Sequence, residues 1–220
     1  IGMITVKNLS LKIQKDVILS DIDLHIERGK ITGLVGRNGC GKTMLMKCIT
    51  GFVKPTQGEI IFDGKKIGDE IDFPKNTGII IETPTFVPYY SGYKNLMELA
   101  MLQKKIGKAE VEEVLKQVGL YEARHKLVRK YSLGMRQRLG IAQALMENPE
   151  TLILDEPMNG LDNECVALVR GILADLKKQG KTILLVSHNA EDIRVLCDVI
   201  YEMDKGRMIA VEVSIQTGSY

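Results

Sequence analysis

The chain has 220 residues, of which 45% are hydrophobic and 26% charged, the proportions of an ordinary globular protein. Its 30 basic and 28 acidic residues leave a net charge of +2, and the basic residues are scattered along the chain. This balance argues against a broad basic surface for nucleic acid. No apolar run approaches the roughly eighteen residues of a membrane-spanning helix, and no secretory signal is expected.

Two kinds of strand are predicted in the first third of the chain. Residues 4–9 and 18–26 alternate between apolar and polar side chains, which is typical of strands with one face in water. Residues 31–35 form a nearly unbroken apolar run, which indicates a buried strand, and residues 44–52 have a helical composition. Further strands are predicted at residues 58–64 and 78–81.

The loop between the buried strand and the helix carries the first chemical signal. It reads Gly-Arg-Asn-Gly-Cys-Gly-Lys-Thr and matches the phosphate-loop pattern G-x-x-x-x-G-K-[ST]. Its glycines allow turns that aim backbone N–H groups at phosphates, and the following helix adds the positive end of its dipole. Lys42 is expected to reach the β- and γ-phosphates, and Thr43 to bind Mg²⁺. The predicted phosphate-binding residues are Gly36, Arg37, Asn38, Gly39, Cys40, Gly41, Lys42 and Thr43.

The second half of the chain changes character and then returns to alternation. Residues 83–131 contain two helical patterns, at 93–105 and 109–118, and a basic stretch at 121–130, which together predict a helical insertion. Helices are then predicted at 132–147, 163–178 and 190–196, and strands at 151–154, 182–186, 199–203 and 207–213. Apolar strands separated by helices predict an α/β fold around a mostly parallel sheet.

Two carboxylates follow the strand predicted at 151–154. Asp155 and Glu156 come at its carboxyl end, where α/β sheets place their ligands. Adjacent strand residues point to opposite faces, so one carboxylate can hold Mg²⁺ while the other faces an attacking water. By itself such a pair is more often part of a solvated turn than of a catalytic site. With a phosphate loop earlier in the chain, the catalytic interpretation is favoured.

Residues 132–138 read Ser-Leu-Gly-Met-Arg-Gln-Arg and open a predicted helix. Ser132 is a good N-cap, Gly134 allows close backbone approach, and an exposed helix start binds anions. From these residues alone, a simple capped helix with a basic first turn is an equally good interpretation.

Together these motifs resemble the ATP-binding cassette (ABC) family over nearly the whole chain. The phosphate loop resembles its Walker A motif, residues 152–156 its Walker B motif, and residues 132–137 its signature motif. Residues 159–162 resemble its D-loop, and Ser187-His188 its switch-histidine loop. The order of the motifs along the chain also matches.

The resemblance implies a fold, partners and a cellular place. The expected fold is that of the P-loop NTPases (RecA-like), with a mostly parallel core sheet, an N-terminal antiparallel β subdomain and a helical insertion. Residues 1–220 would form one nucleotide-binding domain, with a helical subdomain at 83–131 inserted in it. The expected partners are a transmembrane permease and a second cassette bound head to tail, with no nucleic acid. The chain would then lie at the cytoplasmic face of the cell membrane.

The resemblance also implies roles for residues, with ATP and Mg²⁺ as cofactors. Glu156 is expected to be the general base of ATP hydrolysis and His188 to contact the γ-phosphate. Asp162 would couple the two sites of the dimer. The expected Mg²⁺ ligands are Thr43, Asp155 and Glu82, and the signature residues acting on the partner's ATP are Ser132, Leu133, Gly134 and Met135.

The sequence departs from the family pattern at several positions. Leu133 replaces the usual first glycine of the signature, Met135 replaces a glutamine, and Glu82 replaces the glutamine of the Q-loop. In this position the chain resembles the cassettes of bacitracin- and lantibiotic-type exporters, in which a glutamate is usual. The aromatic residue that normally stacks on adenine has Ile13 in its place, with Val17 nearby, which predicts weak and apolar base recognition.

Three functions are compatible with these residues. The first is the ATPase subunit of an exporter whose permease is a separate chain. The second is a soluble cassette ATPase acting on nucleic acid or ribosomes, which the near-neutral charge disfavours. The third is a weakly hydrolysing regulatory module, which only Leu133 suggests. The four cysteines form no CxxC pair, so reduced thiols are expected, and Cys40 is expected to be alkylated unless ATP protects it.

Overall fold

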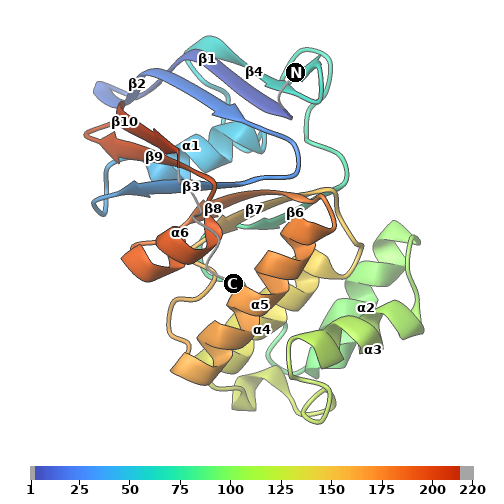
Figure 1. The fold of residues 1–220 in the computed structure, drawn as a ribbon. Helices are drawn as coiled ribbons and strands as arrows, with labels where there is room; N and C mark the ends of the chain where they lie inside the picture. Colours follow the sequence, from blue (N-terminus) through green and yellow to red (C-terminus); the bar gives the residue numbers. More distant parts are fainter. Residues whose placement is uncertain (1–2, 214–220) are drawn as a thin grey trace.

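The computed structural model of the chain describes residues 3–213. Two β-sheets lie one above the other with helix α1 (Lys42–Ile49) between them, and most other helices lie below the larger sheet (Figure 1). None of the helices in this part of the chain is both long enough and apolar enough to cross a bilayer.

The larger sheet has six strands in the order β10-β9-β3-β8-β7-β6. Its strands are β3 Ile31–Gly36, β6 Thr77–Ile80, β7 Thr151–Asp155, β8 Thr182–Val186, β9 Val199–Asp204 and β10 Arg207–Val213. All neighbours pair in parallel except β9 and β10, which form an antiparallel hairpin. The carboxyl ends of β3, β8 and β7 therefore meet at one edge of the sheet, where α/β proteins bind ligands.

Both faces of this sheet are buried, which explains the nearly continuous apolar runs of its central strands. In β7, Leu152 and Leu154 face the core below the sheet, and Ile153 faces the core above it. In β8, Leu185 and Leu184 divide between the same two cores. Such a strand cannot show the alternation of a half-exposed strand, because neither face meets water.

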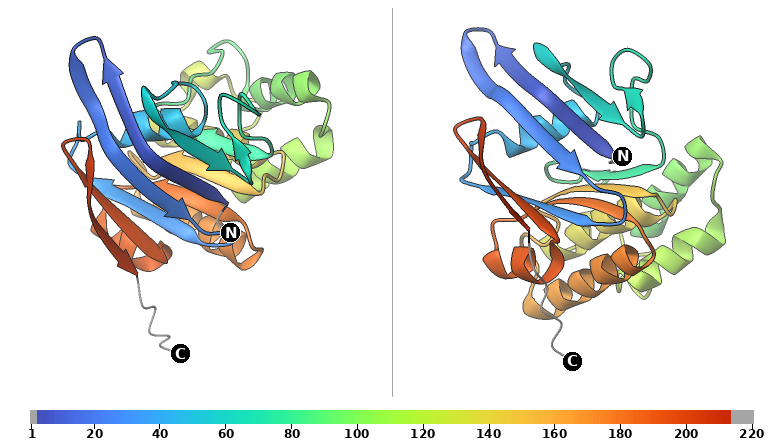
Figure 2. Two further views of the ribbon diagram at one scale, coloured as in Figure 1. Left: turned by 90° about the horizontal axis from the view of Figure 1, so that it is seen from above. Right: turned by 45° about the horizontal axis from the view of Figure 1, so that its top comes forward.

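The smaller sheet covers α1 from above and is antiparallel throughout, in the order β2-β1-β4-β5 (Figure 2). Its strands are β1 Ile4–Ile13, β2 Asp16–Ile26, β4 Gln57–Phe62 and β5 Lys65–Lys66. Apolar residues on its inner face, among them Ile4, Ile22 and Ile60, pack in one cluster with α1 and the upper face of the larger sheet. The phosphate loop is thereby held between two sheets.

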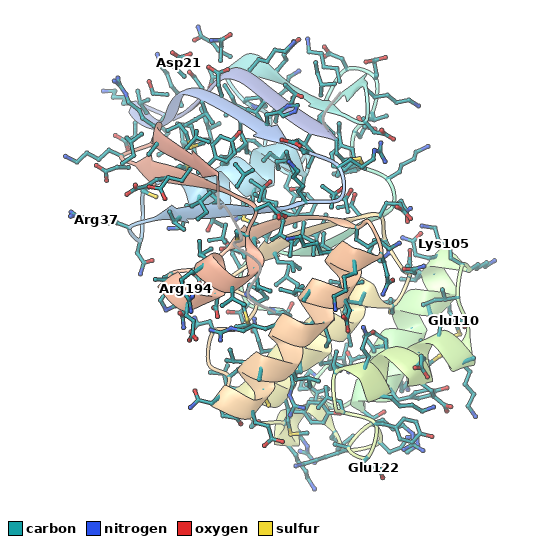
Figure 3. The ribbon with its side chains drawn as sticks, in the orientation of Figure 1. Asp21, Arg37, Lys105, Glu110, Glu122 and Arg194 are labelled. Carbon is teal, nitrogen blue, oxygen red and sulfur yellow. The ribbon has the colours of Figure 1, made fainter. Side chains whose placement is uncertain are left out.

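Helices on the opposite side complete the fold. They are α2 Gly92–Gln103, α3 Lys108–Gln117, α4 Leu133–Leu145, α5 Asn163–Lys178 and α6 Ala190–Leu196, with a 3₁₀ turn at Val128–Lys130. The α2–α3 pair lies to one side of α4, and Figure 3 places Lys105 and Glu110 in this region, far from Asp21 in β2. Residues 83–131 therefore contain α2, α3 and the 3₁₀ turn.

The predicted fold class is confirmed, and the differences lie in the boundaries of elements and in one short strand that was missed. Strand β1 continues to Ile13 instead of stopping at residue 9, because irregular pairing around Asn8, whose φ is 46°, shifts the alternation of its side chains. Helix α1 runs from Lys42 to Ile49, whereas the composition predicted a helix up to residue 52. It ends early because Gly51 has a left-handed φ of 79°, which terminates a helix. Strand β5 was not predicted, because two lysines carry no hydrophobic pattern.

Candidate functional site

The phosphate loop joins the end of β3 to the start of α1. Gly36 has a φ of 147°, and a Cβ at this position would collide with the carbonyl oxygen of Met203 in β9. Gly41 is the N-cap of α1 with a φ of 110°, and it has no side chain with which to cap the helix. The first N–H groups of α1 are thus left for a ligand, and at a helix N-terminus that ligand is an anion.

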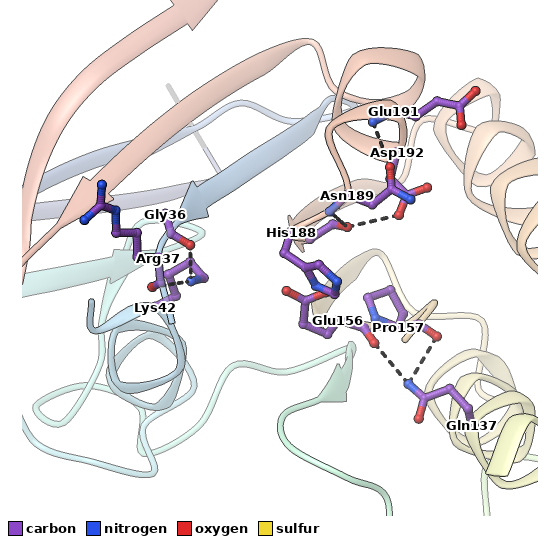
Figure 4. A network of polar contacts seen from close by, with 11 residues as sticks. Gly36, Arg37, Lys42, Gln137, Glu156, Pro157, His188, Asn189, Glu191 and Asp192 are labelled. Carbon is purple, nitrogen blue, oxygen red and sulfur yellow. Dashed lines mark hydrogen bonds and ion pairs between the residues drawn. The ribbon is translucent and has the colours of Figure 1, made fainter. Parts of the chain in front are cut away.

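Lys42 places a positive charge inside this loop. Its Nζ donates to the carbonyl oxygens of Gly36 at 2.7 Å and of Arg37 at 3.0 Å (Figure 4). The side chain is buried, so its position is set by the loop and not by solvent. The charge therefore lies where the loop's backbone converges, as phosphate binding requires.

Thr43 and Asp155 bring two oxygen ligands together from α1 and β7. The Thr43 hydroxyl donates to Asp155 Oδ2 at 2.8 Å. Burial raises the pKa of Asp155, and this effect outweighs the hydrogen bond from Thr43 and the charge of Lys42, which lower it. A partly buried carboxylate beside a hydroxyl fits Mg²⁺, which prefers hard oxygen ligands and takes its remaining ones from water and phosphates. Within residues 3–213 no cluster of three or more His, Cys, Asp or Glu forms a complete protein metal site.

Glu156 and His188 form a second pair at the same edge of the sheet. Glu156 Oε2 lies 2.8 Å from His188 Nδ1, and the two side chains meet in Figure 4. Strand β7 ends at Asp155, and Glu156 has a left-handed φ of 48°. The two carboxylates do face different groups, as predicted. They are separated by this backbone turn, however, and not by the alternation of side chains along a strand.

Gln137 holds this turn in place from α4. Its buried side-chain amide donates to the carbonyl oxygens of Glu156 at 3.2 Å and of Pro157 at 3.1 Å. Sequence reasoning assigned Gln137 no role of its own, although it stands in the stretch compared with the signature motif. Its contact with the turn after β7 depends on how α4 packs, which no local pattern reveals.

A cavity of about 570 Å³ connects these groups. Most of its lining comes from residues with a predicted role. Ile18, Met44 and Thr83 had none, and Gln137 and Asn159 lie in the signature and D-loop stretches without a role of their own. The predicted residues along it are Asn38, Gly39, Gly41, Lys42, Thr43, Glu82, Leu133, Asp155 and Glu156. The phosphate loop, the oxygen ligands and the carboxylate of the second pair thus border one space, whereas Ile13 and Val17 are 44% and 57% exposed and do not line it.

Comparison with known proteins identifies this site. The family model described as ABC transporter matches residues 19–159, which is more than half of the chain. The chain belongs to the ABC transporter family. It is an ATP-binding subunit of such a transporter, and its site is built for ATP hydrolysis.

Individual relatives of this ABC subunit agree with that placement. The uncharacterized ABC transporter ATP-binding protein YybJ of Bacillus subtilis (strain 168) is 44% identical over 206 residues, 94% of each chain. The bacitracin transport ATP-binding protein BcrA of Enterococcus faecalis is 41% identical over 209 residues, 94% of this chain and 68% of BcrA. The dimeric post-hydrolysis structure of the cassette MJ0796, bound to ADP and Pi, has a TM-score of 0.85 and is 25% identical, covering 96% of this chain and 98% of that one.

Glu82 of this ABC subunit lies on the cavity wall in an ion pair. Its Oε1 lies 2.6 Å from Lys47 Nζ of α1, and its backbone has a left-handed φ of 64°. Its charge raises the pKa of Asp155, and the charge of Lys47 lowers it, although both effects are smaller than that of burial. Lys47 thus compensates part of the negative charge that a glutamate adds beside the phosphate site.

The signature and D-loop residues begin two neighbouring helices. Ser132 caps α4 by accepting a hydrogen bond from the Met135 N–H at 3.2 Å, and Asp162 caps α5 in the same way from Cys165 at 2.8 Å. Hydrogen bonds from the start of α5, that from Cys165 first, lower the pKa of Asp162. Leu133 packs against the D-loop, since a Cβ on Gly160 would lie 2.8 Å from Leu133 Cδ2.

The expected reactivity of Cys40 is wrong for the folded chain. Its side chain is only 5% exposed, because it packs under the phosphate loop with its Sγ 3.8 Å from Lys42 Nζ. A reagent cannot reach this thiol without opening the loop. Flanking glycines suggested an open loop, but they instead let the backbone close over the cysteine side chain.

Proposed function

We propose that two copies of this chain close head to tail on ATP, so that each nucleotide is enclosed by both. The observation that carries this proposal is the exposure of groups that must surround a γ-phosphate. Ser132 is exposed, Leu133 is 54% exposed, and the His188 side chain is 63% exposed. The dimeric MJ0796 cassette with ADP and Pi supports this arrangement.

Within such a dimer the residues would divide the chemistry as follows. Lys42 and the N–H groups of the phosphate loop bind the phosphates, and Thr43 and Asp155, with Glu82 as a further candidate, hold Mg²⁺. The bound Mg²⁺ would neutralise charge on the phosphate oxygens. Glu156 would take the proton of the attacking water, and His188 would hold the γ-phosphate contact beside it.

The other residues of this proposal contact either the ATP of the second chain or the adenine ring. Signature residues Ser132, Leu133, Gly134 and Met135 would contact the partner's ATP, and Asp162 would couple the two sites. Ile13 and Val17 would form an apolar wall for adenine, together with Ile18, which lines the cavity.

Mixing two inactive variants tests the composite site. Glu156→Gln removes the base but keeps an intact signature, whereas Ser132→Arg blocks the signature but keeps an intact base. Each variant alone should hydrolyse ATP slowly. A mixture made before ATP is added should recover up to about a quarter of wild-type turnover, because half the dimers pair one chain of each kind and carry one whole site. A mixture no faster than its components would contradict head-to-tail closure.

We further propose that this pair drives a separate permease of an exporter, from the cytoplasmic face of the membrane. Residues 83–131 would form the helical subdomain that receives the permease. The segment after Glu82 supports this, because Val87 is 46% and Tyr89 is 70% exposed, and exposed apolar side chains grouped together mark interaction surfaces. The relative BcrA, named for bacitracin transport, supports a role in transport.

The permease surface can be tested separately from catalysis. Val87→Glu with Tyr89→Glu should leave the turnover of the isolated chain within about twofold of wild type, because neither residue borders the phosphates. Transport in cells that carry the cognate permease should fall at least tenfold, since the contact would bury two charges. Glu122→Gln on the same lobe serves as the matched control. Undiminished transport by the double variant would place the permease elsewhere.

A further inference from the structure

We propose that Arg170 of α5 is a positioning residue that sets the switch-histidine loop through Asp192 of α6. This inference rests on the proposed role of His188 and adds a residue that no motif of the sequence identifies. The hydrogen bonds of Arg170 go to Asp192 and Glu191 of α6 and not to the phosphate loop or Glu156, so it would act on the reaction only through the switch-histidine loop.

Asp192 is the centre of the arrangement, and it is only 3% exposed. Arg170 Nε donates to Asp192 Oδ1 at 2.8 Å, and a second guanidinium nitrogen donates to the same oxygen. The Ser187 hydroxyl donates to the other oxygen, Oδ2, at 3.0 Å. Both carboxylate oxygens are therefore bound, and the charge of Asp192 is balanced by Arg170, as a buried carboxylate requires.

The same contacts fix the backbone on both sides of His188. Ser187 precedes it, and the Asn189 N–H that follows donates to Ser187 Oγ at 3.1 Å. The Asn189 side chain then caps α6 by accepting from the Glu191 N–H at 2.9 Å (Figure 4). His188 itself is mostly exposed, and Glu156 is the one side chain recorded within hydrogen-bond distance of its ring in the described chain. Its position is thus set by its backbone more than by packing.

The location of Arg170 gives this contact a second consequence. Helix α5 begins at the Asp162 cap of the D-loop, and Arg170 lies two turns further along the same helix. A polar cavity of about 460 Å³ is lined by the D-loop, by Arg170 and by His188. A displacement of the D-loop that moves α5 would therefore reach His188 through the ion pair between Arg170 and buried Asp192.

An alternative explanation is that Arg170 only fastens α5 to α6. In that case its loss would lower stability and affect catalysis independently of His188. If Arg170 acts through His188, the two substitutions will not add, because a histidine that is absent cannot be misplaced. The two explanations therefore predict different double variants.

The experiment measures ATP turnover of the full chain for Arg170→Met, His188→Ala and the double variant. Arg170→Met should lower kcat by about tenfold to a hundredfold and change KM for ATP by less than about twofold, as expected for a misplaced group. The double variant should be no slower than His188→Ala alone. Arg170→Lys should recover part of the loss, because it keeps the charge. Lys178→Ala, which breaks an exposed ion pair on the same helix, is the matched control.

Two further measurements separate the proposed role of Arg170 from other causes of a lower kcat. Arg170→Met leaves the carboxylate of Asp192 buried and unpaired, which could itself disturb the fold. The combination of Arg170→Met with Asp192→Asn removes that charge, and it should show the same loss of kcat. The chain has only three histidines, so the imidazole NMR signals of His188 can be followed without nucleotide. They should shift in both variants, while those of His25 and His125 stay unchanged.

Specific outcomes decide between the proposals. Additive losses in the double variant, or unchanged His188 signals in Arg170→Met, would overturn the role of Arg170. An inactive wild-type chain would instead count against the proposed catalytic function, and the NMR comparison would still test the contact between Arg170 and the loop.

Discussion

Replacing Glu156 with glutamine is expected to lower ATP turnover by about 10²–10⁴-fold while ATP still binds. Glutamine has the size of glutamate but cannot take a proton from water. It can keep the contact with His188, whose Nδ1 lies 2.8 Å from the carboxylate, so the site should keep its shape. Phosphate release gives the turnover, and calorimetry gives the affinity for ATP.

The same variant has a second expected property and a clear control. Since closure would persist until hydrolysis, Glu156→Gln chains should accumulate as ATP-bound dimers in light-scattering chromatography. Glu113→Gln changes an exposed carboxylate on α3, whose side chain is 76% exposed, and should behave as wild type. Turnover of Glu156→Gln within about twofold of wild type would remove Glu156 from the role of general base.

Replacing Asp155 with asparagine should weaken binding of ATP with Mg²⁺ at least tenfold and yet stabilise the nucleotide-free chain. Burial raises the pKa of Asp155 above its usual 3.8, so the folded chain holds this proton more tightly than the unfolded chain does. The free energy of unfolding therefore falls as pH rises from about 3.8 through the raised pKa, and the loss persists at neutral pH. Asparagine carries no charge and can still accept the hydrogen bond from Thr43.

Thermal unfolding and binding together check this prediction. At pH 7 without nucleotide the variant should have the higher Tm, and each 1 kcal/mol gained corresponds to about 2–4 °C for a chain of this size. The difference should disappear well below pH 3.8, where Asp155 is protonated in both states. In EDTA, ATP should bind to the variant at least as well as to wild type. If Mg²⁺ strengthened ATP binding equally in both proteins, Asp155 would not be a metal ligand.

The phosphate loop shows how far a local pattern reaches. Its chemistry depends on residues close in the chain, namely glycines that permit unusual φ values, a lysine and a hydroxyl. The flanking strand and helix were also recognisable, because a strand buried on both faces leaves an apolar run. Even here the buried position of Cys40 was missed, since this residue packs in one core cluster with Met203 of β9, more than 150 residues away in the sequence.

The amino-acid sequence by itself determined the fold class, the phosphate loop and the two carboxylates offered for chemistry, because periodicity and short spacings act within a few residues. The resemblance to the ABC family added the order of the motifs and His188. Only the tertiary structure decided that Gln137 holds the turn at Glu156, that Lys47 pairs with Glu82, and that Arg170 reaches Asp192. Each of these pairs joins two elements that meet because helices pack on the sheet. Hydrophobic packing is non-directional, so no local sequence pattern predicts which polar residues it brings together.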